Sequence, residues 1–138
     1  MAKMKGGCMC GKVTYDSAAQ PALTAVCHCL DCQKQSGSAM SIIVAVPGNE
    51  IAFEGELKLY KTVGKDTGLA VNRYFCPTCG SPLYSHAEFM DEMVFIKAGT
   101  LDDTSWLKPD MNIWCDTAQS WVDIDAAIPK FGGNPAAA

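Results

Sequence analysis

The sequence predicts a mainly β fold in a single domain. Its 138 residues are enough for one hydrophobic core and too few for two comfortable domains. Hydrophobic residues make up 49% of the chain and charged residues 19%, which is typical of a globular protein and excludes a disordered one. Short segments rich in β-branched and aromatic residues recur between turns that contain Gly or Pro. We therefore expect short strands packed around one core.

Eight segments show the alternation or the β-branched enrichment that is typical of strands. In chain order they are Lys12–Tyr15, Ser41–Val46, Ile51–Glu54, Leu57–Lys61, Leu69–Phe75, Leu83–His86, Met93–Ala98 and Asn112–Cys115. Only Asp31–Ser36 is typical of a helix, with Asp31 as its N-terminal cap and Gly37 ending it. We expect the domain to span residues 1–131, followed by a flexible tail over residues 132–138.

Charge and hydropathy argue against two classes of partner. The net charge is −4 and lysine and arginine form no cluster, so we expect no nucleic-acid partner. No apolar run approaches the roughly 20 residues that span a bilayer, so we expect no membrane partner. The first seven residues lack the apolar segment of a secretory signal, which predicts a cytoplasmic protein. In that reducing compartment, eight cysteines indicate metal ligands or catalytic groups rather than disulfides.

Seven of the eight cysteines fall into three groups: Cys8 with Cys10, then Cys27, Cys29 and Cys32, then Cys76 with Cys79. The last pair has the C-x-x-C spacing that points two sulfurs at one metal ion. It forms half of a zinc site, and Cys8 with Cys10 can supply the other half. A closed site of four cysteines would staple the N-terminal strand to the middle of the chain and contribute to folding.

The remaining group, Cys27, Cys29 and Cys32, offers three ligands, which is the number typical of a catalytic zinc that keeps one position open. Three thiolates leave such a centre negative, so the thiol of a substrate is a natural fourth ligand. Two alternatives stay open at this point. Cys115 or His28 could complete the shell and make a second structural zinc, or the group could hold an iron–sulfur cluster, although its spacing does not match ferredoxins.

The residues around these cysteines resemble a known family. The segments 7–15, 27–37 and 73–81, together with 99–103 and 121–131, are similar to the glutathione-dependent formaldehyde-activating enzyme (GFA) family, which includes the centromere protein V domain. The resemblance implies several coiled antiparallel β-sheets. It also implies a structural zinc on Cys8, Cys10, Cys76 and Cys79 and a catalytic zinc on Cys27, Cys29 and Cys32. The family often has histidine where this chain has Asn112.

The resemblance also implies an activity. In the family's named reaction, the thiol of glutathione adds to formaldehyde, and the reverse direction classes the enzymes as carbon–sulfur lyases. We therefore expect a zinc-dependent lyase that forms or cleaves the S-hydroxymethyl adduct of a small thiol such as glutathione. Lys34 and Arg73, beside the cysteine motifs, are candidates for binding the glutathione carboxylates. The alternative is a non-catalytic, zinc-stapled module that binds a protein or a thiol carrier.

Overall fold

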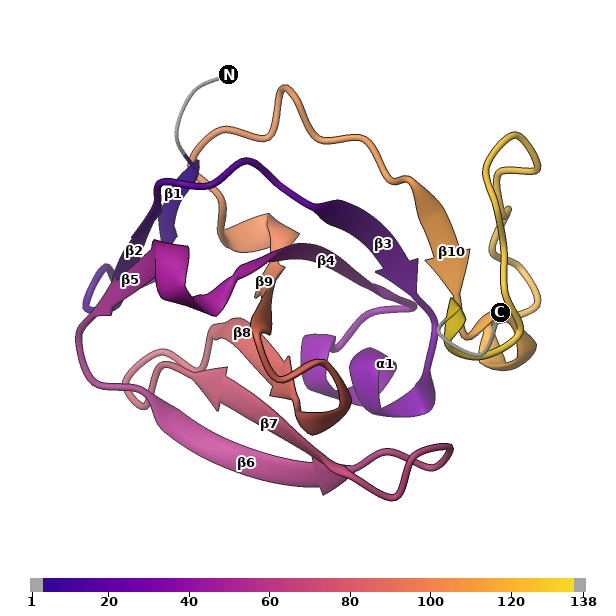
Figure 1. Cartoon of the computed structure of the whole chain (residues 1–138), viewed down its shortest axis with the longest axis horizontal. Coiled ribbons are helices and arrows are strands. Elements are labelled where there is room, and N and C mark those ends of the chain that lie inside the picture. The colour runs from indigo at the N-terminus through magenta and orange to yellow at the C-terminus, as the bar shows by residue number, and fades with distance from the viewer. Residues whose placement is uncertain (1–3, 136–138) are drawn as a thin grey trace.

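Strands dominate the fold, as the sequence predicts. Across residues 4–135, which the computed structural model describes, ten strands form two sheets and there is one α-helix (Figure 1). The order is β1-β2-β5 in the small sheet and β10-β3-β4-β9-β8-β7-β6 in the large sheet. No helix in this part of the chain has the length and apolar character needed to cross a membrane.

Short elements build both sheets. The small sheet contains β1 (Met4–Gly7), β2 (Thr14–Ser17) and β5 (Ile51–Glu54). The large sheet contains β3 (Leu23–Cys27), β4 (Ser41–Pro47), β6 (Lys58–Val63), β7 (Ala70–Phe75), β8 (Pro82–Ala87), β9 (Met93–Lys97) and β10 (Met111–Ile113). The helix α1 is Leu30–Ser36, and single 3₁₀ turns cover Gly48–Glu50, Glu88–Met90, Ala98–Thr100 and Cys115–Thr117.

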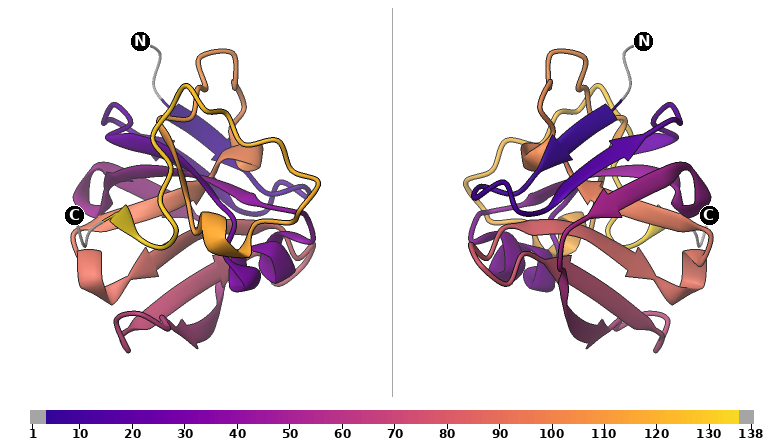
Figure 2. Two further views of the ribbon diagram at one scale, coloured as in Figure 1. Left: turned by 90° about the vertical axis from the view of Figure 1, so that its right-hand side faces the viewer. Right: turned by 90° about the vertical axis from the view of Figure 1, so that its left-hand side faces the viewer.

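The expected mainly β fold with one short helix is confirmed. Strand pairing is antiparallel throughout both sheets except between β3 and β10, which run parallel. The large sheet curls, and α1 lies on its open side (Figure 1). In Figure 2 the small sheet lies at one end of the molecule and the β6–β7 hairpin at the other.

The central strands of the large sheet are buried on both faces. Side chains alternate along a strand, so on β4 Val44 and Val46 point to one face and Ile43 and Ala45 to the other. Val44 and Val46 belong to the main core, which they share with Tyr15 of the small sheet. Ile43 and Ala45 pack in separate clusters on the opposite face. One face of the large sheet therefore carries the core, and the other is free to line a cavity.

The sequence does not predict β1 and β3. Two of the four residues of β1 are glycines and one is Lys5, so the segment lacks the β-branched side chains typical of strands. The prediction that Asp31 caps the helix is wrong. The helix begins one residue earlier, because the Cys29 sulfur takes the capping position and accepts a hydrogen bond from the Cys32 amide. Gly37 ends the helix in a left-handed conformation, as expected.

The last described residues lie beside the turn that follows β10. The carbonyl of Phe131 accepts a hydrogen bond from the Cys115 amide at 3.0 Å, and that of Gly133 accepts one from the Trp114 amide at 3.1 Å. These contacts include the first residues of the expected tail, whose end at residues 136–138 lies outside the described residues. The domain boundary at residue 131 stays a prediction.

Gly6 lies where the small sheet contacts the segment after β9. It pairs with Tyr15 and forms a β-bridge to Leu101, and a β-carbon there would overlap the Thr100 carbonyl oxygen and the Tyr15 hydroxyl. We expect Gly6→Ala to lower the free energy of unfolding by about 1–3 kcal/mol, measured by urea denaturation. The control is Gly99→Ala, whose β-carbon would meet no atom within 4 Å, and it should change stability by less than about 0.5 kcal/mol. Equal losses in the two variants would contradict this account.

Candidate metal centres and the adjoining cavity

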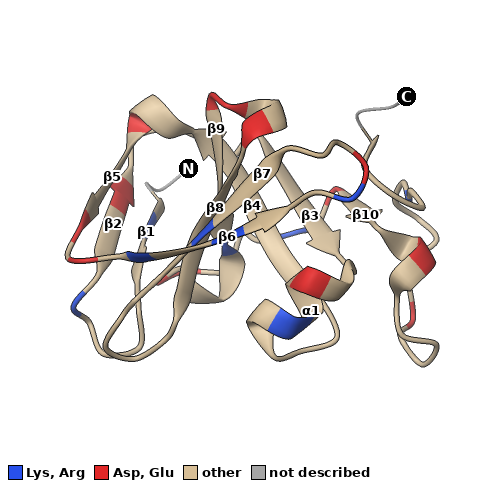
Figure 3. Ribbon diagram, turned by 90° about the horizontal axis from the view of Figure 1, so that it is seen from below, with Lys and Arg blue, Asp and Glu red and all other residues tan. Residues whose placement is uncertain are grey.

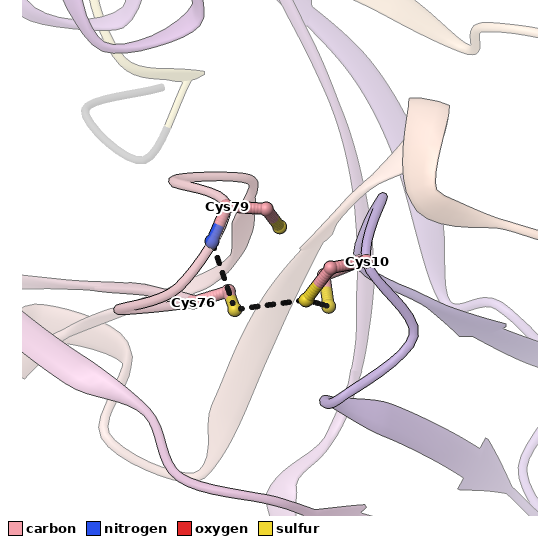
Figure 4. A group of neighbouring side chains, drawn as sticks. Cys10, Cys76 and Cys79 are labelled. Atoms are coloured by element: carbon pink, nitrogen blue, oxygen red, sulfur yellow. Dashed lines mark hydrogen bonds between the residues drawn. The ribbon is translucent and has the colours of Figure 1, made fainter.

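Four cysteines from two distant loops come together. Cys8 and Cys10 follow β1, Cys76 and Cys79 lie between β7 and β8, and their four sulfurs all lie within 4.8 Å of one another. The Cys10 sulfur is 3.6 Å from that of Cys8 and 3.7 Å from that of Cys76, and Figure 4 shows the two loops facing each other. Sulfurs bound tetrahedrally to one zinc ion at 2.3 Å are about 3.8 Å apart. The cluster therefore has the dimensions of a metal site and could hold an ion.

The turn after β7 aims its two cysteines by backbone hydrogen bonds. The amides of Thr78 and Cys79 point at the Cys76 sulfur, at 3.4 and 3.5 Å. Gly80 closes the turn by donating its amide to the Cys76 carbonyl at 2.9 Å, and its φ of +80° is accessible to glycine at little cost. The C-x-x-C-G sequence therefore fixes this half of the site locally.

Hydrogen bonds favour the thiolate forms of Cys8 and Cys79, whereas burial and the neighbouring thiols raise the pKa of Cys10 to about 11. The Val13 amide donates to the Cys8 sulfur at 3.3 Å. Hydrogen bonds from the hydroxyl and the backbone of Ser81 lower the pKa of Cys79 to about 5. Donors that stabilise the charged form are what a thiolate ligand requires. All eight cysteines are free thiols, so the close approach of these sulfurs is not caused by a disulfide.

The second cluster lies where β3 meets α1. Cys27 ends the strand, Cys29 caps the helix and Cys32 lies in its first turn. The three sulfurs all lie within 4.8 Å of one another, with those of Cys27 and Cys32 3.4 Å apart. Within residues 4–135, neither His28 nor Cys115 adds a fourth ligand atom to this group. The cluster could hold an ion through three protein ligands.

Because the three thiols lie so close together, the pKa values of Cys27 and Cys32 shift in opposite directions. Hydrogen bonding with Cys29 and Cys32 raises the pKa of Cys27 well above its ordinary value. Hydrogen bonding with Cys27 and Cys29, helped by the positive charges of Lys97 and Arg73, lowers the pKa of Cys32 to about 2. Three sulfurs at this spacing cannot all ionise without a compensating cation. A metal ion among them would provide that charge.

Two basic side chains are buried near this cluster. Lys97 on β9 is 6% exposed and donates a hydrogen bond to the Ser41 hydroxyl at 3.0 Å. Burial lowers the pKa of Lys97, and the negative charge of Cys32 opposes that shift. Arg73 on β7 is 7% exposed and donates to Thr62 and Gln35 at 2.9 and 2.8 Å. Figure 3 shows that the other basic residues are scattered over several elements, among them β6 and α1.

A cavity of about 200 Å³ adjoins the three cysteines, which form part of its lining. Its walls come mainly from the face of the large sheet that points away from the main core, and both Arg73 and Lys97 line it. Trp114 contributes to the wall from just beyond β10, where its φ of +58° places it in the left-handed region. That conformation costs about 1–2 kcal/mol in a non-glycine residue, and strained residues often occur at functional sites.

Of the two residues expected to bind the glutathione carboxylates, only one lines the cavity. Arg73 is buried in the cavity wall, whereas Lys34 is exposed on α1 and is not part of the lining. Sequence analysis missed Lys97, the second buried cation. Its position held a signal, because it lies two residues from Phe95 on the same face of an otherwise apolar strand.

The matches to known proteins point to one family. A family model described as glutathione-dependent formaldehyde-activating enzyme matches residues 3–117. The chain belongs to this family. A relative from Aspergillus flavus is 27% identical over 107 residues, and one from Penicillium rubens is 26% identical over 110 residues. Both bear the family's enzyme name provisionally.

These relatives are longer than this chain. The matches cover 74% and 78% of this chain but only 55% and 56% of the relatives, so the chain spans about half their length. A crystal structure of a Rhodobacter sphaeroides protein has a TM-score of 0.58 and 21% identity, covering 92% of this chain and 99% of that one. At that identity, the likeness supports the fold alone.

Asn112, at the position where the resemblance leads us to expect a histidine, pairs with His28. His28 is 1% exposed, and its Nε2 lies 2.9 Å from Asn112 Oδ1, so we assign the proton to Nε2. The His28 amide donates to the Ile113 carbonyl at 3.0 Å, and its carbonyl accepts from Thr117 at 3.0 Å and from Gln33 at 2.8 Å. These bonds fix the cysteine segment that contains His28 against β10.

Removing the acceptor should leave the buried His28 proton unpaired. We expect Asn112→Ala to lower the free energy of unfolding by about 1–3 kcal/mol, measured by urea denaturation. Asn72→Ala is a matched control, because Asn72 lies 3.3 Å from Nδ1 of His86, whose side chain is 22% exposed and can bond to water instead. Its loss should stay below about 1 kcal/mol. Similar losses would show that the His28–Asn112 bond does not anchor the segment.

Proposed function

We propose that this protein is a zinc-dependent enzyme of the carbon–sulfur lyase type. It joins a small thiol, such as glutathione, to an aldehyde, such as formaldehyde, and cleaves the same adduct. The observation that supports this most directly is the cluster of three cysteines at the wall of a cavity. The names of the family and of the curated relatives add glutathione and formaldehyde as substrates. Free cysteines suit a reducing compartment such as the cytoplasm.

Two zinc ions account for both cysteine groups. Cys8, Cys10, Cys76 and Cys79 would hold a structural ion with a closed, four-sulfur shell. The three cysteines of the other group would hold the catalytic ion and leave one position for the substrate. When bound there, zinc supplies a positive centre that favours the thiolate form of a substrate thiol at neutral pH.

The surrounding charges suit an anionic substrate group. Three thiolates beside the cationic side chains of Arg73 and Lys97 leave one excess negative charge. A divalent ion would turn this into one excess positive charge, and a substrate thiolate would cancel it. Charge balance in a buried site therefore favours one further anion.

The reaction forms one bond between the thiol sulfur and the aldehyde carbon. The carbonyl π electrons pass to oxygen, and the proton released by the thiol ends on that oxygen as the adduct's hydroxyl. The side chains of Arg73 and Lys97 are suited to stabilise the negative oxygen, because each has N–H groups beyond those in its observed hydrogen bonds. The walls of the cavity hold the two reactants together and limit access of water.

Two cysteine variants test the division into a catalytic and a structural site. Cys29→Ser should keep the fold and lose at least about 100-fold of the enzyme-dependent rate of adduct formation, measured by NMR with glutathione and formaldehyde. Cys115→Ser, outside both groups, is the control and should keep both. Cys76→Ser should unfold or aggregate, because structural zinc contributes about 10–16 kcal/mol, as much as a domain's whole stability.

Two outcomes would contradict the proposal. If Cys29→Ser forms the adduct at the rate of the unaltered protein, the three-cysteine group is not catalytic, and a non-catalytic, zinc-stapled binding module becomes the better account. If Cys29→Ser and Cys76→Ser unfold alike, the division into catalytic and structural sites is wrong. Circular dichroism and zinc content distinguish these two outcomes.

A further inference from the structure

We propose that the thiol accepted by this site is a small monothiol with a compact hydrocarbon body, in preference to glutathione. The inference rests on the proposed function and specifies its substrate. It is carried by the composition of the cavity wall next to the three cysteines.

The wall is apolar and continuous with the cysteine cluster. Leu23, Ala25 and Cys27 alternate along β3 and point to the same face, so the apolar wall leads directly to the first cysteine. Strand pairing extends it sideways, because Ala25 lies opposite Ile43 and Leu23 lies opposite Ala45, which in turn pairs with Phe95. A group attached to a sulfur at the cysteine cluster therefore meets hydrocarbon.

The second apolar cluster on this face extends the same surface. Ala87, Phe95 and Val71 pack together there, and Ile43 contacts both this cluster and the one that contains Cys27 and Cys32. The cavity thus runs from the cysteines into a pocket whose walls are mainly aliphatic and aromatic, with Thr62, Ser85 and Thr117 among the polar residues of the lining. Burial of apolar surface is the main source of affinity in such a pocket.

The charges of the lining do not match glutathione. Glutathione carries two carboxylates and one ammonium group besides its thiol. Arg73 and Lys97 keep N–H groups beyond those in their observed hydrogen bonds, but the excess positive charge around the cluster is balanced by one anion, and the substrate thiolate supplies it. The other charged lining residues, Asp31, Lys65 and Asp66, include two acids and are more exposed than these two. Further carboxylates in the cavity would lose hydration without a positive charge left to balance theirs.

Size favours the same substrate class. The cavity of about 200 Å³ is smaller than the roughly 300–1,000 Å³ typical of sites for drug-sized ligands. It suits a hydrocarbon group comparable to one apolar side chain. The rest of a tripeptide would lie beyond it, in the adjoining hollow of about 650 Å³ that shares Asp66, Trp114 and Asn134 with the cavity.

A series of thiols tests the proposal on the unaltered, zinc-loaded protein. The probes are ethanethiol, 1-propanethiol and 1-butanethiol, with 2-mercaptoethanol as a polar match for 1-propanethiol and glutathione as the competitor. Binding is read by calorimetry and by the change in tryptophan fluorescence, since Trp114, one of three tryptophans, lines the cavity. We expect each added methylene to tighten binding about threefold to fourfold. We also expect 1-propanethiol to bind about tenfold or more tighter than 2-mercaptoethanol, and 1-butanethiol to bind tighter than glutathione.

A variant in the cavity wall tests whether the hydrocarbon group of the thiol binds there. Ala87→Leu places a larger side chain in the cavity lining and should abolish the gain from ethanethiol to 1-butanethiol, at unchanged zinc content. Ala52→Leu is the matched control, because Ala52 is exposed on β5, and it should leave the series unchanged. A chain-length gain that survives Ala87→Leu would place the apolar group elsewhere and overturn the proposal.

Failure of this inference is distinguishable from failure of the proposed function. If glutathione binds as tightly as 1-butanethiol and the adduct forms, the preference for an apolar thiol is wrong and the enzyme function stands. If glutathione binds best and the chain-length gain appears with aldehydes from formaldehyde to butanal, the pocket belongs to the aldehyde and the assignment to the thiol is overturned. If none of these thiols binds, both proposals fail.

Discussion

The large sheet has to bury side chains on both faces, because one face packs on the small sheet while the other lines the cavity. This demand falls on β4 and β9, where Val44 and Ile96 serve the main core and Ile43 and Phe95 serve the cavity side. Both strands are short and mostly apolar, and their neighbours on either side complete the curl around the cavity. A side chain on the cavity face is therefore held by a rigid sheet, which is a favourable support for a site that must keep three sulfurs in fixed positions.

On the cavity face of the large sheet, the largest unfavourable contribution to the free energy of folding is the burial of charged side chains. Burying Lys97 and Arg73 away from water is unfavourable unless each finds hydrogen bonds and a negative partner. Ser41, Thr62 and Gln35 supply hydrogen bonds, and the Cys32 thiol in the first turn of α1 supplies the negative charge. The cations and the cysteines thus compensate each other, and a metal ion in the cluster would leave room for one more anion. In our account, binding of a substrate thiol follows from this balance, and the apolar walls then select what the thiol carries.

Sequence alone predicts the parts of this site that depend on local spacing. The turn at Cys76–Gly80 is encoded by C-x-x-C-G, and the grouping of the cysteines into a set of four and a set of three follows from their spacing and from the family resemblance. Features that depend on strand register cannot be predicted from local spacing in the sequence. Lys97 comes to the cavity through the pairing of β9 with β4, and Asn112 reaches His28 through the parallel pairing of β10 with β3. The strand β1 is also missed, because its glycines permit close contact with neighbouring segments rather than favouring an extended chain.

The most direct test of the open, three-cysteine site is the metal content and the zinc-edge X-ray absorption of protein purified without chelator, before and after addition of 1-butanethiol or glutathione. Our account predicts two zinc ions per chain that share seven cysteine sulfurs. On addition of thiol, one oxygen or nitrogen ligand of zinc should be replaced by a sulfur, which brings the number of sulfur ligands to eight. A single zinc ion, or two ions whose sulfur count does not change with either thiol, would contradict it.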